Sequence, residues 1–210
     1  MSRPRPTLAT ALATALAKGL AKGLATGLTV LALSLPAVAA APLGDDGLHK
    51  PDWLRATFKD LPEDLAEANA EGKRLLILFE QRGCIYCARM HEEVLSDPRI
   101  EALIREGYFV VQMNLAGSTE VTDFDATSAT EKEMARRWGI MFTPTLIFLP
   151  EDVPADQTAA QAAVATMPGA FGKVTTQALL TWVRAHGYAE GEMFQDYLAA
   201  QIRSGAIPME

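Results

Sequence analysis

The chain holds only two cysteines, Cys84 and Cys87, and four residues separate the first of them from the end of a short apolar run. Residues 75–79 read Leu-Leu-Ile-Leu-Phe, which is typical of a buried strand because the run is short and bounded by turn residues. Gly83 breaks this segment, and a helix is predicted to begin near Cys84. The pattern therefore places both cysteines at the point where a strand turns into a helix.

The spacing of the two cysteines suits reversible chemistry better than a structural crosslink. A disulfide that closes so small a loop gains about 2 kcal/mol from chain entropy, against about 4.7 kcal/mol for a 100-residue loop. Positions three apart on a helix face the same way, so the two sulfurs can close a disulfide or resolve a mixed one. We therefore predict a redox-active disulfide in which Cys84 attacks as a thiolate and Cys87 resolves.

Predicted strands and helices alternate along the rest of the chain. Strands are expected over 74–79, 108–115, 145–149 and 164–167, the last at a sheet edge. Helices are expected over 62–71, from Cys84 to Ile104 with a break at Asp97-Pro98, and over 130–138, 176–186 and 192–203. Phe194, Leu198 and Ile202 should face inward, and the stretches 116–127 and 150–161 should be loops. This order predicts an α/β fold with helices on both faces of a central mixed β-sheet.

Residues 1–39 differ from the rest of the chain in composition. They hold four basic residues and no acidic one, followed by an apolar run at 24–35 and the small-residue stretch Ala37-Val38-Ala39. These are the parts of a secretory signal peptide, and the run is shorter than the roughly 20 residues that cross a bilayer. We expect a cleavable signal peptide over 1–39, a flexible leader over 40–58 and one domain over 59–210. The protein would then be periplasmic, and an uncleaved anchor is the alternative.

The charge of the chain limits the kinds of partner that it can have. The formal net charge is −7, and loss of the four basic residues of 1–39 would bring it to −11. Such an acidic surface repels nucleic acid and anionic lipid. We therefore expect no nucleic-acid partner. We also expect the protein to be a monomer and its partners to be proteins.

A second motif, Phe142-Thr143-Pro144-Thr145, stands directly before the strand expected at 145–149. Alone, Thr-Pro is an ordinary turn. Together with the upstream Cys-x-x-Cys, it resembles the thioredoxin superfamily, in which a cis proline packs against the redox pair. The resemblance implies a thioredoxin-like fold with the Cys-x-x-Cys at a helix N-terminus. It also implies that Thr143 and Pro144 lie beside Cys84, with the Thr143 backbone binding an extended peptide.

Five longer sequence segments indicate which subfamily the chain resembles. Residues 79–84, 87–93, 121–125, 131–135 and 142–145 look like the periplasmic thioredoxins of the SoxW type, which belong to bacterial sulfur-oxidation systems. This implies an enzyme, a thiol–disulfide oxidoreductase, that passes electrons from a membrane thiol reductase to disulfides of periplasmic proteins. The clients would be sulfur-oxidation proteins or cytochrome precursors.

The residues around the cysteines influence the direction of electron transfer and the contact with a substrate. Ile85 and Tyr86 bring no charge to the Cys84 sulfur, so we expect a fairly reducing couple. The positive charges of Arg82 and Arg89 would stabilise a thiolate on Cys84 and make the couple more oxidising. Both side chains can turn to solvent, where screening weakens this effect. Tyr86 should lie near the surface, where it either contacts a partner or covers the disulfide.

The chain departs from cytosolic thioredoxins at two positions. Gly83 stands where they have a tryptophan, and Leu78 stands where they carry a buried aspartate. Glu80 shares the strand parity of Leu78, so it either takes over proton transfer or is a surface glutamate. Other large apolar residues are expected in the core by default; these are Met134, Trp138, Met141 and Phe142.

Two other functions remain open. Cys84, Cys87 and His91 fall at helix spacings that permit a copper or zinc site, which would make the chain a metal-binding chaperone. Three ligands on one helical turn rarely close a tetrahedron, so we expect neither a metal nor another cofactor and predict His91 at the helix surface or boundary. Within the enzymes, the alternative is a disulfide oxidase or isomerase of secreted proteins.

Overall fold

The computed structural model describes residues 41–207 of the chain. The signal peptide predicted over 1–39 lies outside these residues and stays a prediction. Among the helices of 41–207, none is long and apolar enough to cross a membrane.

A five-stranded sheet with the order β1-β3-β2-β6-β7 forms the centre of the domain. Its strands are β1 (Leu54–Arg55), β2 (Arg74–Glu80), β3 (Tyr108–Asn114), β6 (Thr145–Phe148) and β7 (Ala165–Pro168). Strand β3 runs parallel to β1 and β2, whereas β6 is antiparallel to both β2 and β7. The sheet is therefore mixed, as predicted, with β2 and β3 among its inner strands.

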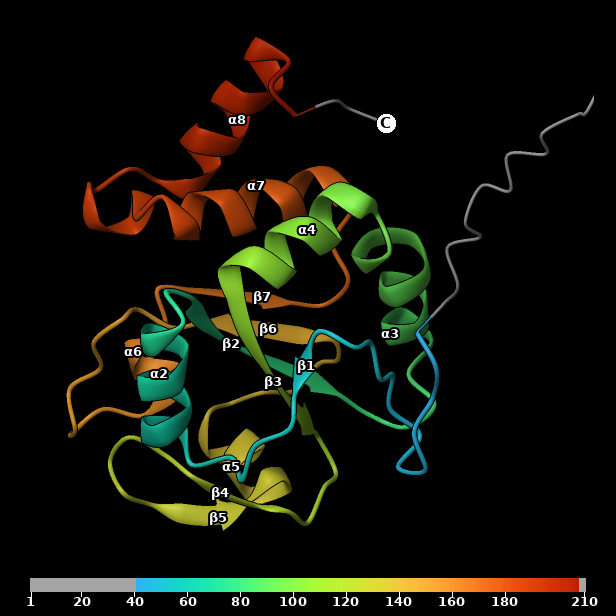
Figure 1. The fold of residues 1–210 in the computed structure, drawn as a ribbon, viewed down its shortest axis with the longest axis vertical. Coiled ribbons are helices and arrows are strands. Elements are labelled where there is room, and N and C mark those ends of the chain that lie inside the picture. The colour runs from blue at the N-terminus through green and yellow to red at the C-terminus, as the bar shows by residue number, and fades with distance from the viewer. Residues whose placement is uncertain (1–40, 208–210) are drawn as a thin grey trace, which may run out of the picture. The chain divides into compact units, whose positions relative to one another are not determined.

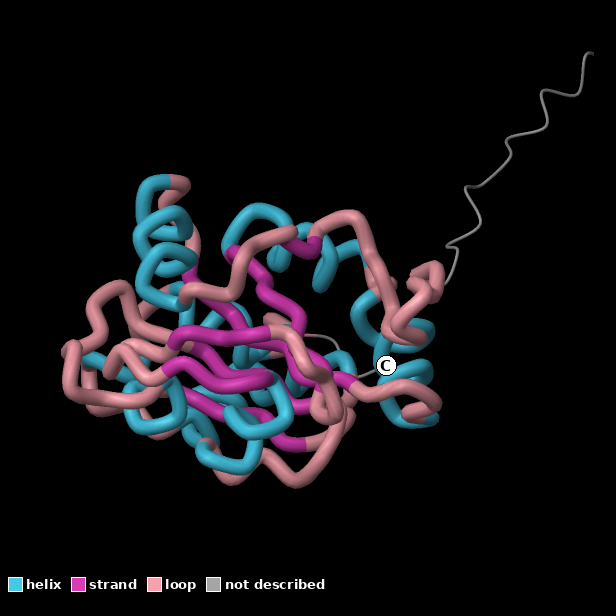
Figure 2. Tube along the Cα trace, turned by 90° about the horizontal axis from the view of Figure 1, so that it is seen from below, coloured by secondary structure: helices cyan, strands magenta, loops and turns pink. Residues whose placement is uncertain are grey.

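Helices cover both faces of this sheet, which confirms the predicted α/β layering (Figures 1 and 2). Helices α4 and α7 lie on one face, and α2, α5 and α6 lie on the other (Figure 1). The helical segments are α2 (Leu61–Ala70), α3 (Ile85–Arg89), the π-helical turn η1 (Met90–Leu95), α4 (Pro98–Gly107), α5 (Glu131–Arg137), α6 (Ala159–Ala162), α7 (Lys173–Arg184), the 3₁₀ turn η2 (Gly187–Ala189) and α8 (Phe194–Ser204).

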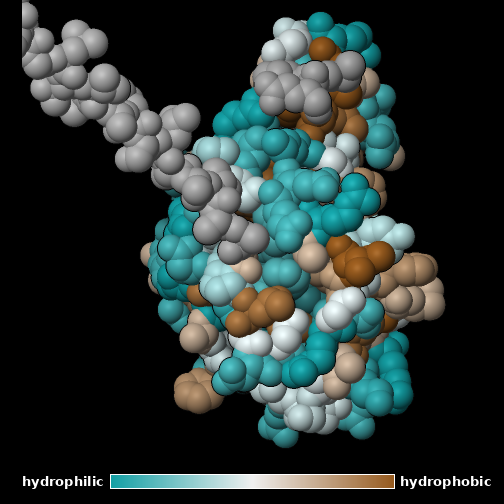
Figure 3. Space-filling model, turned by 90° about the vertical axis from the view of Figure 1, so that its right-hand side faces the viewer, coloured by the Kyte–Doolittle hydropathy of each residue, from teal (hydrophilic) through white to brown (hydrophobic). Residues whose placement is uncertain are grey.

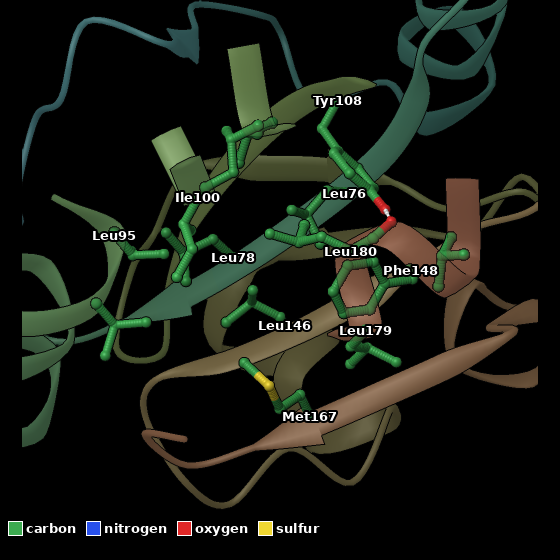
Figure 4. Close-up of a cluster of buried hydrophobic side chains, with 14 of the residues drawn as sticks. Leu76, Leu78, Leu95, Ile100, Tyr108, Leu146, Phe148, Met167, Leu179 and Leu180 are labelled. Carbon is green, nitrogen blue, oxygen red and sulfur yellow. Dashed lines mark hydrogen bonds between the residues drawn. The ribbon is translucent and has the colours of Figure 1, made fainter. Parts of the chain in front are cut away.

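Strand β2 is buried along its whole length, so its side chains divide between two cores. Leu76 and Leu78 join the core under α4 and α7, and the odd-numbered residues of 75–79 join the core under α2 and α5. Alternation of this kind follows from the two-residue period of a strand. Figure 4 shows the first core, where the Tyr108 hydroxyl donates a hydrogen bond of 2.6 Å to the carbonyl of Leu180.

Three helices begin at capping residues that the sequence provides. The side chains of Asp60, Asp97 and Thr130 accept hydrogen bonds from backbone N–H groups in the first turns of α2, α4 and α5. Thr130 and Glu133 form both hydrogen bonds of the predicted capping box. These local signals explain why the starts of the helices lie close to their predicted positions.

The described part of the expected leader is packed against the domain instead of being flexible. Leu48 and Trp53 are only 3% and 9% exposed, and β1 pairs with β3. Arg82 also donates hydrogen bonds to the backbone carbonyls of Asp45 and Asp46. The turn-rich composition of this segment hides its packing, because each anchor depends on a partner that is distant in the sequence.

Three further expectations are corrected. The stretch 116–127 contains strand β4 (Glu120–Thr122), which pairs with β5 (Ser128–Thr130), and 150–161 contains the start of α6. No residue of α8 is fully buried; Phe194, Leu198 and Ile202 are half-buried. Helix α8 lies on α7, outside the layer that touches the sheet, so only one side of it is covered (Figure 1).

Candidate active site

The two cysteines lie at the start of the helix that follows β2. Gly83 has a φ of +74°, a conformation that glycine adopts without steric strain, and it turns the chain out of the strand. Cys84 is the N-cap residue of α3, and it forms a disulfide with Cys87 one turn later. The strand-to-helix junction thus forms as the sequence predicts.

The two sulfurs differ in their access to solvent. Cys87 is completely buried, whereas Cys84 is partly exposed. The backbone N–H of Cys87 donates a hydrogen bond of 3.0 Å to the Cys84 sulfur. In the reduced protein, this donor and the helix N-terminus would stabilise a thiolate on Cys84.

Thr143 and Pro144 lie beside the disulfide. The Thr143 hydroxyl donates a hydrogen bond of 3.3 Å to the Cys84 sulfur, and the Thr143 carbonyl oxygen lies 3.4 Å from the same sulfur. The peptide bond between Thr143 and Pro144 is cis. The sequence pointed to the backbone of Thr143 only, so its hydroxyl is a further group at the sulfur.

Hydrogen bonds on both sides hold the 142–145 turn in place. The Thr145 hydroxyl donates to the carbonyl of Phe142 at 2.8 Å, and the Gly169 N–H donates to the carbonyl of Pro144 at 2.7 Å. The second bond extends the pairing of β6 with β7. The position of Thr143 relative to Cys84 therefore depends on the sheet itself.

Large apolar side chains stand exposed on the two segments that meet at Cys84. Ile85 and Tyr86 are 68% and 56% exposed, and Met141 and Phe142 are 74% and 61% exposed. The last two correct our expectation of core positions: they lie in the loop that leads from α5 to the Thr143 turn, and their side chains point to solvent. Figure 3 shows apolar patches within a largely hydrophilic surface on the side of the molecule that carries α3. Exposed apolar groups around a reactive sulfur are typical of a surface that receives another chain.

The two arginines near the cysteines have partners elsewhere. The Arg82 guanidinium donates to the backbone carbonyls of Asp45 and Asp46, and Arg89 forms an exposed ion pair with Glu93. The hydrogen bonds that the structure gives to the Cys84 sulfur come from the Cys87 N–H and the Thr143 hydroxyl. These two neutral donors therefore define its polar surroundings.

Glu80 and His91 are both buried, which rules out the surface positions that we considered for them. They are 1% and 3% exposed, and the His91 Nε2 lies 2.9 Å from the Glu80 Oε1. His91 belongs to a helical stripe of buried residues, Cys87, Met90, His91, Val94 and Leu95, a spacing that could have placed it inside from the sequence. Whether Glu80 transfers protons is a separate hypothesis.

The metal-ligand set considered from the sequence does not form. Both cysteine sulfurs belong to the disulfide, and His91 contacts Glu80 and His49. Within residues 41–207, the group that could hold a metal ion is His49, Glu80 and His91.

Comparisons with known proteins agree with this fold and site. Residues 61–155 match the family model described as a thioredoxin-like domain, a range that includes both cysteines, Thr143 and Pro144. No curated protein matches the chain.

Several solved structures are similar to the chain. A thioredoxin-fold protein from Helicobacter pylori is 17% identical, with a TM-score of 0.51, over 62% of this chain and 85% of that one. A thioredoxin from Thermus thermophilus is 28% identical, with a TM-score of 0.49, over 63% of this chain and 90% of that one. The C-terminal domain of DsbD from Neisseria meningitidis is 14% identical, with a TM-score of 0.39, over 62% of this chain and 98% of that one.

These observations confirm the thioredoxin-like fold that the resemblance implied. The matched domain and the Cys84–Cys87 disulfide together support the activity of a thiol–disulfide oxidoreductase.

Proposed function

We propose that the protein is an exported reductase of the SoxW type, which passes electrons from a membrane thiol reductase to disulfides of periplasmic proteins. Its clients would be proteins of sulfur oxidation or of cytochrome maturation. The observation that carries the proposal is the asymmetry of the disulfide: Cys84 is partly exposed at a helix N-terminus, and Cys87 is buried behind it. The protein would act as a monomer.

The arrangement supports a two-step exchange. The Cys84 thiolate attacks one sulfur of a client disulfide, which forms a mixed disulfide and releases the other client sulfur as a thiolate that takes up a proton. The Cys87 thiol then loses its proton and attacks the Cys84 sulfur. This step releases the client as a dithiol and leaves the Cys84–Cys87 disulfide. Two electrons have then moved to the client, and a donor with its own thiol pair must return two.

The surroundings of Cys84 support electron transfer from the protein to the client. A strongly oxidising couple needs a strongly stabilised thiolate in the reduced form. Here the Cys84 sulfur has two neutral donors, while Arg82 and Arg89 are engaged elsewhere. Modest stabilisation of the thiolate favours a reducing couple.

The exposed apolar residues support a protein client. Ile85 and Tyr86 on one side, and Met141 and Phe142 on the other, offer apolar contact to an extended segment that passes Cys84. The Thr143 backbone would then bind that segment as an added strand would. Export is supported by the composition of residues 1–39.

Two assays on the purified protein test the thiol–disulfide exchange activity and the direction of electron transfer. We expect the reduced protein to accelerate the dithiothreitol-driven reduction of insulin, and Cys84→Ser to abolish the effect. An Arg136→Gln variant is the control, because its side chain is exposed on α5. The opposite result is that the reduced protein fails to reduce insulin while the oxidised protein reoxidises reduced ribonuclease. The protein is then an oxidase, and the proposed direction of electron transfer is wrong.

A further inference from the structure

Three side chains from distant parts of the chain converge beside the redox helix. His49 comes from the N-terminal segment, Glu80 ends β2, and His91 lies in η1. The Glu80 Oε1 lies 3.2 Å from the His49 Nδ1 and 2.9 Å from the His91 Nε2. One ligand atom from each residue lies within 4.8 Å of the other two.

The buried Glu80 carboxylate needs a nearby positive charge to offset the loss of its hydration. Glu80 is 1% exposed and its ion-pair partners are the two histidines, which carry charge only when protonated. The imidazole rings of His49 and His91 stack with centroids 4.4 Å apart, and the Trp53 ring stacks on His91. Removing a carboxylate from water costs several kcal/mol unless a charge compensates for it. A cation between the rings and the carboxylate would provide that compensation.

Two of the three separations between the ligand atoms match those around a metal ion. Bonds of 2.0–2.1 Å from zinc to nitrogen or oxygen place tetrahedral ligand atoms about 3.3 Å apart. The two distances at Glu80, 2.9 and 3.2 Å, are already close to this value. Two histidines and one glutamate are also the ligands of a known class of zinc site, in which the fourth position is left to water.

The carboxylate is held in the orientation that a ligand needs. The Gln112 side-chain amide donates to the Glu80 Oε2, which leaves Oε1 facing the histidines. Gln112 also donates to the His49 carbonyl at 2.7 Å, and the Lys50 ammonium donates to the Gln112 Oε1 at 2.6 Å. Supporting hydrogen bonds of this kind raise the affinity of metal sites 10- to 100-fold.

We propose that His49, Glu80 and His91 bind one divalent cation of the zinc class. A hollow of about 260 Å³, lined by His91, Trp53, Lys50 and Pro42 among others, opens beside one of the three ligands. The cysteines are not ligands, so the oxidised protein binds the ion as well. The ion would tie the N-terminal segment to β2 and η1, and zinc would raise the Tm of the protein by binding only to its folded state.

Calorimetric titration of the oxidised protein with Zn²⁺ tests the proposal. The protein must carry no histidine tag, because the chain has only three histidines of its own. We expect one equivalent to bind, and His49→Gln to lower the affinity at least tenfold. His186→Gln is the matched control, because His186 is the remaining histidine and pairs with Glu151. It should leave the affinity unchanged.

A second measurement on the unaltered protein keeps the test valid if His49→Gln does not fold. In nitrogen-detected spectra of the imidazoles, Zn²⁺ should shift the signals of His49 and His91 and leave those of His186 in place. The proposal is wrong if the oxidised protein takes up no Zn²⁺, if His49→Gln binds as the wild type does, or if the two imidazoles show no shift. Insulin reduction is a separate readout, so failure of this site would leave the proposed redox function intact.

Discussion

The different exposure of the two sulfurs supports different roles for Cys84 and Cys87. Cys87 is fully buried and Cys84 is partly exposed, so under the proposed function a client disulfide would approach Cys84. The buried thiol is nevertheless held next to its partner, since the Cys87 N–H donates to the Cys84 sulfur. We therefore predict that Cys84 attacks and that Cys87 resolves the mixed disulfide.

This difference predicts which variant traps clients. Cys87→Ser should accumulate mixed disulfides with client proteins, because Cys84 still attacks and nothing resolves the product. Cys84→Ser should accumulate none. Non-reducing electrophoresis of periplasmic extracts measures both, and equal trapping by the two variants would contradict the assignment.

The Thr143 hydroxyl predicts a second effect at the same sulfur. Thr143→Val keeps the shape of the side chain but removes a donor to the Cys84 sulfur. A hydrogen bond to a charged group contributes about 1.5–3 kcal/mol, and sulfur is a weak acceptor, so the lower end applies. Alkylation of reduced Cys84 by iodoacetamide at pH 7 should slow by about 10-fold.

Thr181→Val provides the control for this experiment. It makes the same change in α7, where the hydroxyl donates to the carbonyl of Gln177, and it should leave the alkylation rate as in the wild type. A Thr143→Val protein that reacts as fast as the wild type would show that the hydroxyl does not stabilise the thiolate.

Among the elements, α2 carries an acidic residue whose burial opposes its charge. Burial raises the pKa of Asp64 from 3.8 to about 6, although the Thr57 hydroxyl, which donates to it at 3.2 Å, acts in the opposite direction. The folded state thus binds a proton more tightly than the unfolded state. Stability is therefore lost as the pH rises from about 4 to about 6, and ionised Asp64 destabilises the fold above that range.

Asp64→Asn should relieve this penalty at neutral pH. The free energy of unfolding should rise by about 1–2 kcal/mol at pH 7.5, which is less than the full shift implies. At pH 4 the variant should gain little, because Asp64 is already protonated in the fold. Urea unfolding at both pH values measures the difference, and Glu106→Gln, at an exposed position of α4, is the control. A gain of equal size at pH 4 and pH 7.5 would contradict the assignment.

The elements also differ in how far the sequence predicts them. Strand β2 and helix α5 are predicted nearly residue for residue, because an apolar run and a capping box are local signals. The β4–β5 hairpin and α6 depend instead on buried Asp123, which accepts from the Trp138 indole at 2.7 Å and from the Ala159 N–H at 2.8 Å. Those partners are 15 and 36 residues away along the chain, so no local pattern reveals them.

The same distinction applies to the candidate site. Cys84 and Cys87 are predicted by their spacing, and Thr143 and Pro144 by resemblance to a family. The cluster of His49, Glu80 and His91 is not predicted, because His49 belongs to a segment whose packing depends on tertiary contacts. Met141 and Phe142 were misplaced for a related reason: large apolar residues are assigned to the core unless a binding surface is already known.

At the scale of the whole molecule, the proposed function requires that the protein be exported. The described domain begins its packing at residues 42–50, directly after the predicted signal peptide. We predict that the mature protein starts near Ala40, because the small residues at 37–39 form a cleavage site. N-terminal sequencing of periplasmic material measures this, and a full-length, membrane-bound product would contradict it.

The reduction potential of the Cys84/Cys87 couple decides whether the protein is a reductase. Couples of this motif range from about −270 mV in thioredoxin to about −120 mV in a strong oxidant. The purified protein would be equilibrated with glutathione buffers, and the oxidised fraction would be counted by alkylation and mass measurement. Because the Cys84 sulfur has only two neutral donors in the described structure, we predict a potential near the thioredoxin end of the range. A value more positive than about −150 mV would make the protein an oxidant and contradict the account.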